Sequence, residues 1–427
     1  MLQTIKYPEK SEWQKILQRP VIDSVSLEET VDGVLIDIRK NGDEAIRKYT
    51  KKFDGIDLSN FSVGSDEISN AINNVTEELK AAIQTAKSNI EKFHNSQREK
   101  ETIIETTNGV ECWRRSIAIE KVGLYIPGGS APLFSTILML SIPAKIAGCK
   151  EIVLCTPPDK NGKVNDAILY TAQLTGITKI FKIGGVQAIG AMAFGTESVT
   201  KVYKIFGPGN QYVTCAKQLI NKSGIAIDMP AGPSELAVLA DTNCVASYVA
   251  ADLLSQAEHG ADSQVILVSD NEQTIAEVAK ELKKQLEQLP RRDIATKALA
   301  NSKAILVNTL AEGMELLNEY APEHLILACN EPEKIANQVV NAGSVFIGNY
   351  SCESAGDYAS GTNHTLPTNG YAKSYSGVSL DSFVKKVTFQ KLSKEGIQNI
   401  GKSIELMAEA EGLDAHKNAV TLRLKSL

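Results

Sequence analysis

The chain has five histidines, and four of them lie beside carboxylates or a glutamine. In LLSQAEHGADS, Gln256 and His259 stand three residues apart at the end of a segment with helical periodicity. On a helical wheel both fall on one flank of the apolar stripe, whereas Glu258 points toward solvent. Gly260 is expected to end the helix. The pair could bind a metal ion, although a histidine that caps the last helical carbonyls is the simpler interpretation of this segment alone.

A second candidate is the adjacent pair Glu323 and His324 in APEHLIL, at the beginning of an apolar strand. Neighbouring residues of a strand point to opposite faces unless the backbone turns, and Pro322 makes such a turn plausible. A carboxylate and an imidazole are the commonest proton acceptors in catalysis. A solvated strand entrance remains the alternative.

A third candidate is the segment ESAGDYASGTNHTLPTNGYA, which carries Asp357 and His364. It is rich in Gly, Ser, Thr and Asn, and it follows the strand SVFIGNY. The pattern predicts a long loop after the carboxyl end of a strand, where open α/β sheets bind ligands. Loops of this length inside a compact domain are usually functional.

The remaining histidines lie in helical segments. Glu411 and His416 occur in AEAEGLDAH near the carboxyl terminus, which by itself is typical of a surface helix. His94 lies on a polar helix and is interpreted as structural. Together, the histidine segments favour a metal site built from histidine and aspartate.

Composition excludes several classes of protein. The net charge of -6 argues against a nucleic-acid interface, and no apolar run reaches the roughly 20 residues that a membrane-spanning helix needs. The first residues are polar and do not resemble a secretory signal. Seven scattered cysteines without a CxxC pair indicate buried thiols in a reducing compartment.

The elements that must position these residues change character along the chain. Helical patterns dominate the first hundred residues, and short apolar strands then alternate with helices. Strands that are apolar throughout are typical of parallel sheets covered on both faces. The number of strands predicts two α/β units, divided near Asp228–Glu235. From about residue 380 the chain is charged and helical, as in a packed edge or an oligomer arm.

Three glycine-containing turns could bind an anionic ligand. They are YIPGGSAP, KIGGVQAIG and FGPGNQYV, and each is expected between a strand and a helix. Such turns can offer backbone N–H groups to a phosphate, although any one of them alone could be a simple tight connection. GxGxxG, a Walker loop, GxSxG and HExxH are all absent from the sequence.

The order of the motifs resembles the histidinol dehydrogenase family over essentially the whole chain. The matching segments are YIPGG, IGGVQAIGAMAFGTESV, KIFGPGN, DMPAGPSE, SQAEHG, APEHL, GDYASGTNHTLPT and EGLDAH. The resemblance implies two successive NAD⁺-dependent oxidations, of L-histidinol to L-histidine through bound histidinaldehyde, in the last step of histidine biosynthesis. It also implies a cytoplasmic homodimer with one zinc ion per subunit, and neither a nucleic-acid nor a membrane partner.

The resemblance also implies residue roles. Glu323 and His324 correspond to the acid/base residues. The implied zinc ligands are Gln256, His259, Asp357 and His416. The implied substrate contacts are Ser234, Gln256, His259, His324, Asp357, Glu411 and His416. The implied NAD contacts are Tyr125, Gln187 and Asn210. The tail that bears Glu411 and His416 is expected to complete the partner's site.

The implied fold has two incomplete Rossmann-like units with parallel-rich sheets and helical segments at both ends. The expected division is a helical arm at 1–21, a larger metal-binding and catalytic unit at 22–124 and 235–378, an inserted NAD-binding unit at 125–234, and a helical tail at 379–427. Two alternatives stay open: a zinc hydrolase that activates water with Glu323, and a non-enzymatic protein with a scaffold metal.

Overall fold

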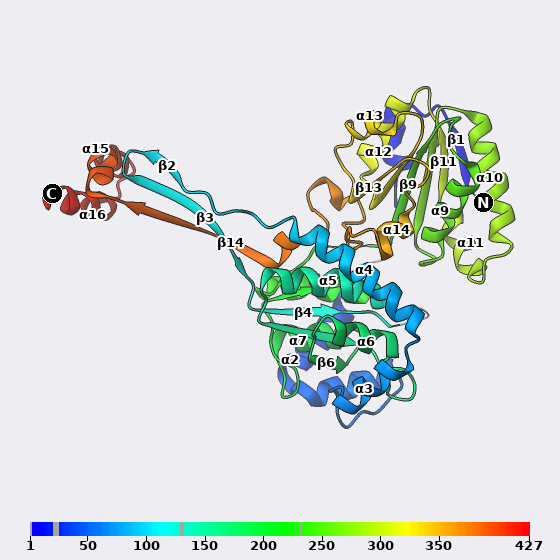
Figure 1. Ribbon diagram of the computed structural model, residues 1–427, viewed down its shortest axis with the longest axis horizontal. Helices are drawn as coiled ribbons and strands as arrows, with labels where there is room; N and C mark the ends of the chain where they lie inside the picture. The colour runs from blue at the N-terminus through cyan, green and yellow to red at the C-terminus, as the bar shows by residue number, and fades with distance from the viewer. Residues whose placement is uncertain (1, 20–24, 129–131, 231) are drawn as a thin grey trace.

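The computed structural model describes residues 2–19, 25–128, 132–230 and 232–427. Two parallel sheets covered by helices form two neighbouring units, and an antiparallel ribbon carries a pair of helices away from them (Figure 1). The predicted α/β class, with parallel sheets and helices near both ends of the chain, is confirmed.

The first unit is built on a six-stranded parallel sheet of order β1-β11-β10-β9-β12-β13. Its strands are β1 (Gln3–Lys6), β9 (Glu235–Ala240), β10 (Gln264–Ser269), β11 (Lys303–Leu306), β12 (His324–Ala328) and β13 (Ser344–Ile347). One face is covered by α9 (Ala246–Ala257), α10 (Glu272–Leu286) and α11 (Arg292–Ala300). The other is covered by α1 (Trp13–Ile16), α12 (Leu310–Tyr320) and α13 (Pro332–Ala336). Because helices cover both faces, β9 and β10 are buried along their whole length.

The second unit has a five-stranded parallel sheet of order β6-β5-β4-β7-β8. Its strands are β4 (Lys121–Tyr125), β5 (Glu151–Thr156), β6 (Lys179–Lys182), β7 (Lys204–Phe206) and β8 (Ala226–Ile227). One face packs against α2 (Val25–Phe53), α7 (Gly185–Phe194) and α8 (Gln211–Lys222). The other packs against α3 (Ser65–Asn74), α5 (Phe134–Ala147) and α6 (Asp166–Leu174), and α4 (Glu77–Asn95) packs on α5.

The division of the chain differs from the expected one at residues 22–124. Helices α2 and α3 pack on the second sheet: Val31 and Leu35 of α2 share a core with α7 and α8, and Ala71 of α3 lies in the core of the other face. Helix α4 packs on α5 of the same unit. The insertion between β1 and β9 therefore begins near residue 25. Its other end lies near the expected position, since β8 ends at Ile227 and β9 begins at Glu235. The expected boundary between 21 and 22 lies outside the described residues.

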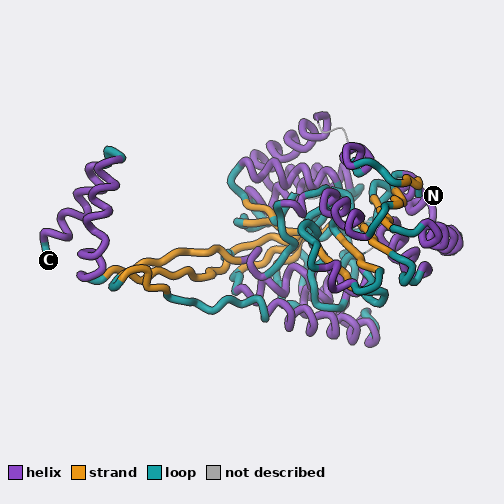
Figure 2. Tube along the Cα trace, turned by 90° about the horizontal axis from the view of Figure 1, so that it is seen from above, coloured by secondary structure: helices purple, strands orange, loops and turns teal. Residues whose placement is uncertain are grey.

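Both terminal segments contain strands that the helical predictions missed. In the described part of segment 1–21, residues 2–19, β1 is an edge strand paired with β11, and helix is confined to 10–16. In segment 379–427, β14 (Val384–Leu392) pairs with β3 (Val110–Ala118), which also pairs with β2 (Ile104–Thr107). The segment is helical as expected in α15 (Lys394–Ala410), in α16 (Asp414–Lys425) and in a short 3-10 helix, Leu380–Phe383. Helices α15 and α16 pack on each other at the far end of the ribbon, clear of both units (Figures 1 and 2).

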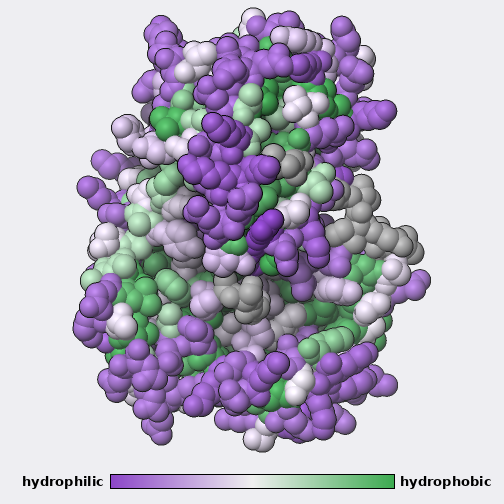
Figure 3. All heavy atoms as spheres, turned by 90° about the vertical axis from the view of Figure 1, so that its right-hand side faces the viewer, coloured by the Kyte–Doolittle hydropathy of each residue, from purple (hydrophilic) through white to green (hydrophobic). Residues whose placement is uncertain are grey.

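The surface and the thiols are consistent with the composition. Viewed from the right-hand side of Figure 1, most of the surface is hydrophilic, and hydrophobic side chains are exposed in scattered patches (Figure 3). All seven cysteines are free thiols. Among the described residues, no helix is both long enough and apolar enough to cross a membrane.

A buried ion pair fixes one turn of the second unit. Lys217 on α8 pairs with Asp228, and both side chains are almost fully buried. Lys217 Nζ donates to the carbonyl of Gly207 (2.9 Å), and the N–H of Gly207 donates to Asp228 Oδ2 (2.9 Å). Gly207 has φ +128°, and a Cβ there would lie 2.0 Å from the carbonyl oxygen of Tyr125. The pair therefore holds both backbone groups of a glycine that nothing larger could replace.

Replacing Lys217 by Met should destabilise the second unit by about 3–5 kcal/mol, because Asp228 would be left buried without its partner. The measurement is the shift in the midpoint of thermal unfolding. A matched control is Lys150→Met, since Lys150 pairs with Glu120 at the surface and such pairs contribute about 0–1 kcal/mol. Equal shifts for the two variants would contradict the importance of the buried pair.

Candidate functional site

Glu323 and His324 lie together at the start of β12. Ala321 ends α12 in the left-handed region (φ 53°), and Pro322 follows it. This change of direction lets both side chains point to one region: Glu323 Oε2 lies 3.7 Å from His324 Nδ1. Both residues are buried. The pair is therefore enclosed by protein rather than forming a solvated strand entrance.

The backbone of Glu235, at the start of the adjacent strand β9, contacts both members of the pair. Its N–H donates to Glu323 Oε2 (2.8 Å), and its carbonyl oxygen lies 3.1 Å from His324 Nδ1. A carbonyl only accepts, so His324 Nδ1 carries a proton, and in the neutral imidazole the lone pair lies on Nε2. Nε2 is buried, lacks a hydrogen-bond partner among the described residues, and lies 3.6 Å from Asp357 Oδ1.

Asp357 belongs to α14 (Glu353–Tyr358), a short helix in the segment predicted to be a loop. Ligand atoms of His259, Glu353 and Asp357 all lie within 4.8 Å of one another. Glu353 is buried, accepts a hydrogen bond from Ser255 Oγ (3.3 Å) and lies 3.8 Å from His324 Nδ1. Sequence reasoning missed Glu353, although its spacing of four from Asp357 would have placed both on one face of a helix.

Gln256 lies in the last turn of α9, and His259 follows the helix, which ends at Ala257 rather than at Gly260. His259 therefore lies beyond the helix, and the helical wheel does not apply to it. Gln256 is fully buried, and both polar atoms of its amide lack a partner among the described residues. A buried amide without hydrogen bonds is unfavourable, and a cation bound to its oxygen would satisfy part of that need. The donor set thus fits a metal ion.

Glu411 and His416 are not brought to this site within one chain. Glu411 caps α15, and His416 lies on α16, so both are at the far end of the ribbon (Figure 1). Both are exposed. Of the expected metal ligands, Gln256, His259 and Asp357 belong to the first unit, and His416 is remote from them.

The site lies where β9 and β12 begin, at the amino ends of the strands. His324 is the first residue of β12, and Glu235 is the first residue of β9. The expectation that the segment around Asp357 faces the carboxyl ends of the strands is wrong. The chain leaves β13 and forms α14, which packs against α9 and returns Asp357 to the opposite edge.

Burial and charge shift the acidity of the whole cluster. Burial raises the pKa of Glu323 and that of Glu353 to about 8 each. Burial alone would lower the pKa of His324, but the nearby Glu353, Glu323 and Asp357 raise it instead. Burial would likewise raise the pKa of Asp357, yet pairing with His324 lowers it. Three carboxyl groups thus surround one imidazole, a setting that attracts positive charge.

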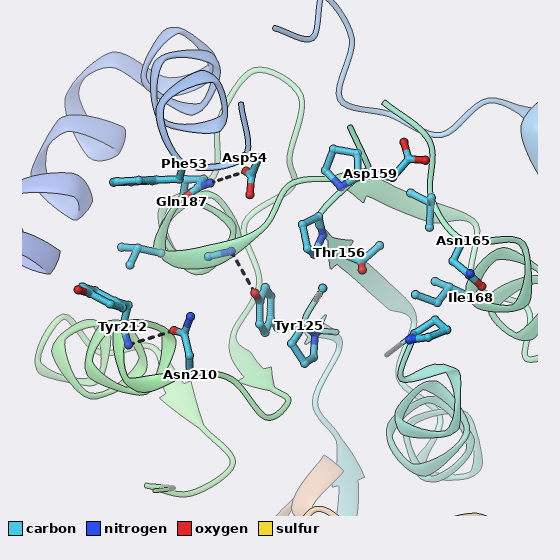
Figure 4. A pocket seen from close by; sticks show the side chains of 18 of the residues that line it. Phe53, Asp54, Tyr125, Thr156, Asp159, Asn165, Ile168, Gln187, Asn210 and Tyr212 are labelled. Atoms are coloured by element: carbon cyan, nitrogen blue, oxygen red, sulfur yellow. Dashed lines mark hydrogen bonds between the residues drawn. The ribbon is translucent and has the colours of Figure 1, made fainter. Parts of the chain in front are cut away.

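The expected cofactor residues line a separate cavity of about 1020 Å³ in the second unit (Figure 4). Tyr125 ends β4, and its hydroxyl accepts from the N–H of Gly185 (3.0 Å). Gln187 on α7 donates to Asp54 (3.1 Å). Asn210 caps α8 by accepting from the N–H groups of its first turn. These residues lie at the carboxyl ends of the strands, where helix N-termini can bind phosphate.

Two of the three glycine turns therefore begin helices at this cavity, α7 and α8. In the third turn, YIPGGSAP, residues 129–131 lie outside the described residues. A cleft of about 950 Å³ joins the cavity region to the first unit. Tyr125 and Asn210 line it on one side, and Ser234 and His259 line it on the other. Ser234 thus faces the space between cofactor residues and candidate metal ligands.

Comparison with known proteins identifies the family. The histidinol dehydrogenase family model matches residues 17–424. The histidinol dehydrogenases of Bacteroides fragilis and Bacteroides thetaiotaomicron are 61% and 60% identical to the chain, over the full length of both partners. A crystal structure of histidinol dehydrogenase from Elizabethkingia anophelis matches with a TM-score of 0.98 and 60% identity, over 100% of this chain and 98% of that one. The chain therefore belongs to the histidinol dehydrogenase family of enzymes.

Proposed function

We propose that the chain oxidises L-histidinol to L-histidine with two NAD⁺, through bound L-histidinaldehyde, as the final step of histidine biosynthesis. Family membership supports this reaction. The observation that carries the proposal is the buried Glu323–His324 pair, whose free Nε2 lies beside Asp357 in the unit that faces the expected cofactor residues. A base beside a nucleotide cleft is what alcohol oxidation requires.

His324 acts as the base in both oxidations. The carbonyl of Glu235 holds the Nδ1–H, so the neutral imidazole has its lone pair on Nε2, which takes the hydroxyl proton while the hydride leaves for NAD⁺. The nearby carboxyl groups raise the pKa of His324, so the neutral form that acts as the base becomes more abundant as the pH rises. His324 releases the first proton to solvent before the second oxidation. The second oxidation starts from an aldehyde hydrate, which again supplies a hydroxyl proton and a hydride. The enclosed position of His324 limits competition from solvent for that proton.

Glu323 activates the water that attacks the aldehyde. Burial raises its pKa to about 8, so the carboxyl group can both accept and return a proton near neutral pH. The N–H of Glu235 fixes one oxygen of this carboxyl group. The other oxygen is then available to the water.

Gln256, His259 and Asp357 would hold the zinc ion, with His416 of the partner subunit as the fourth ligand. A bound zinc ion would supply a Lewis acid that orients the substrate and polarises its oxygen. Ser234 and the partner subunit's Glu411 would contact the substrate. Tyr125, Gln187 and Asn210 would contact NAD, whose phosphates suit the helix N-termini at the cavity.

Exchange of the ribbon and its helices between two subunits would complete each site. The helices expose large apolar side chains, including Leu406 (53%), Met407 (66%) and Leu422 (59%). Single apolar groups on a surface need no explanation, but several on two helices that lie away from both units favour contact with another copy. The proposed assembly is a homodimer. The proposed location is the cytoplasm, which suits the free cysteines.

Replacing His324 by Asn should slow both oxidations by about 100- to 10,000-fold, because both need the same base. Replacing Glu323 by Gln should slow aldehyde oxidation more than alcohol oxidation. NADH formation is measured at 340 nm with L-histidinol and with L-histidinaldehyde. Glu315→Gln, a surface carboxyl group paired with Lys10, is the control. Equal losses on both substrates for Glu323→Gln would contradict the division of roles.

Removing the metal should stop turnover without unfolding the chain. With L-histidinol and NAD⁺, two NADH should form per histidinol, and a chelator should abolish this until zinc is restored. Unfolding on chelation would instead indicate a scaffold metal. Water-dependent cleavage of a substrate without any NADH would favour the zinc hydrolase.

Mixing two inactive variants tests whether the site is shared. His416→Ala removes a residue of the tail, and His324→Asn removes the base. After dissociation and reassociation together, about half of the dimers should be mixed, and each should hold one intact site, giving about one quarter of wild-type activity. Activity that never recovers, in samples shown to contain mixed dimers, would mean that each chain supplies its own His416.

A further inference from the structure

Arg19, in the segment that follows α1, contacts two residues next to the Glu323–His324 pair, Glu235 and Tyr320. Its Nε and Nη2 donate to the two carboxylate oxygens of Glu235, with Nη2 at 2.9 Å from Oε2. Nη2 also donates to the carbonyl of Tyr320 (2.7 Å), and the guanidinium stacks on the Tyr320 ring at 4.1 Å. One side chain therefore ties the start of β9 to the end of α12.

The two ends that Arg19 joins are those that carry the catalytic groups. Glu235 presents its N–H to Glu323 and its carbonyl to His324. Tyr320 lies three residues before Glu323 on the continuous chain from α12 to β12. A shift of the Glu235 backbone would displace the carboxyl group of Glu323. The same shift would break the contact that holds a proton on Nδ1 of His324.

The side chain of Glu235 has no role of its own in the proposed reaction, yet it is buried and ionisable. Its exposed fraction is 3%, and that of Arg19 is 17%. Besides Arg19, the N–H of Asn369 donates to its Oε1 (2.8 Å). A buried carboxylate is unfavourable unless it is fully paired, so retaining one at this position needs a reason. A planar guanidinium that binds both oxygens fixes orientation as well as charge.

We propose that Arg19 is a positioning residue for the oxidation: by holding Glu235 against the end of α12, it fixes the backbone groups that orient Glu323 and His324. The inference rests on the roles given to these two residues in the proposed function. Among the described residues, Arg19 donates its hydrogen bonds to Glu235 and to the end of α12, not to Glu323 or His324. It therefore acts on these two residues through Glu235. Its loss should therefore affect both oxidations alike, unlike the loss of Glu323 alone.

The test compares Arg19→Met and Arg19→Lys with the wild type on L-histidinol and on L-histidinaldehyde. We expect Arg19→Met to lower kcat about 10- to 100-fold on both substrates, since displacement of catalytic groups by about 1 Å has effects of this size. KM for NAD⁺ should change less than about twofold, because Arg19 does not line the candidate cofactor cavity. The kcat of Arg19→Lys should lie between those of the wild type and Arg19→Met, because lysine keeps the charge but cannot make the paired contacts.

Arg115→Met is the matched control. Arg115 also binds both oxygens of a carboxylate, Glu101 (2.7 and 3.0 Å), and lies over an aromatic ring, Phe389, at 4.9 Å. The pair is exposed and does not contact the Glu235 cluster, so Arg115→Met should leave kcat within about twofold of the wild type in protein shown to remain dimeric. Thermal unfolding of every variant shows whether the protein is folded at the assay temperature.

A double-mutant cycle with Glu235→Gln tests the route of action. If Arg19 acts through Glu235, Arg19→Met should change kcat by less than about twofold in the Glu235→Gln background. Retained kcat in folded Arg19→Met, or additive losses in the double variant, would overturn the inference. A wild-type protein that does not oxidise L-histidinol would instead overturn the proposed function.

Discussion

The structure depends on the burial of ionisable side chains at the amino ends of β9 and β12. Glu323, His324 and Glu353 are withdrawn from water and must be compensated by hydrogen bonds and opposite charge. The compensating groups come from distant segments: the backbone of Glu235 and the hydroxyl of Ser255. The fold is therefore constrained to bring β9, α9, α14 and β12 to one point.

The insertion places this point beside the candidate cofactor cavity. The chain leaves the first sheet after β1, builds the second unit, and re-enters at Ser234 and Glu235, directly at the buried cluster. The carboxyl edge of one sheet thereby shares a cleft with residues at the amino edge of the other. The proposed hydride transfer would need the base and the nicotinamide on the same small substrate, and this connection would provide that proximity.

The sequence predicted those elements whose pattern is set by burial on both faces. Strands such as β9 and β10 are apolar throughout, and parallel sheets follow from them. The ribbon was missed because it is half exposed, and the lysines of β14 are equally typical of a surface helix. The apolar stripe of α2 indicates that it packs on something, but it does not indicate which sheet. Assignment of residues 25–95 therefore required the structure.

The residues of the candidate site, like the elements of the fold, could be predicted from the sequence only in part. Gln256 with His259, and Glu323 with His324, were recognisable because each pair is local in sequence. Glu235 and Glu353 were not, because their importance lies in contacts across 88 and 98 positions of the chain. The rule that ligands bind at carboxyl ends of strands suits the candidate cofactor cavity and fails for the candidate metal cluster. It fails because a short crossing helix, α14, can carry a carboxylate back across the sheet, so strand polarity alone does not locate chemistry.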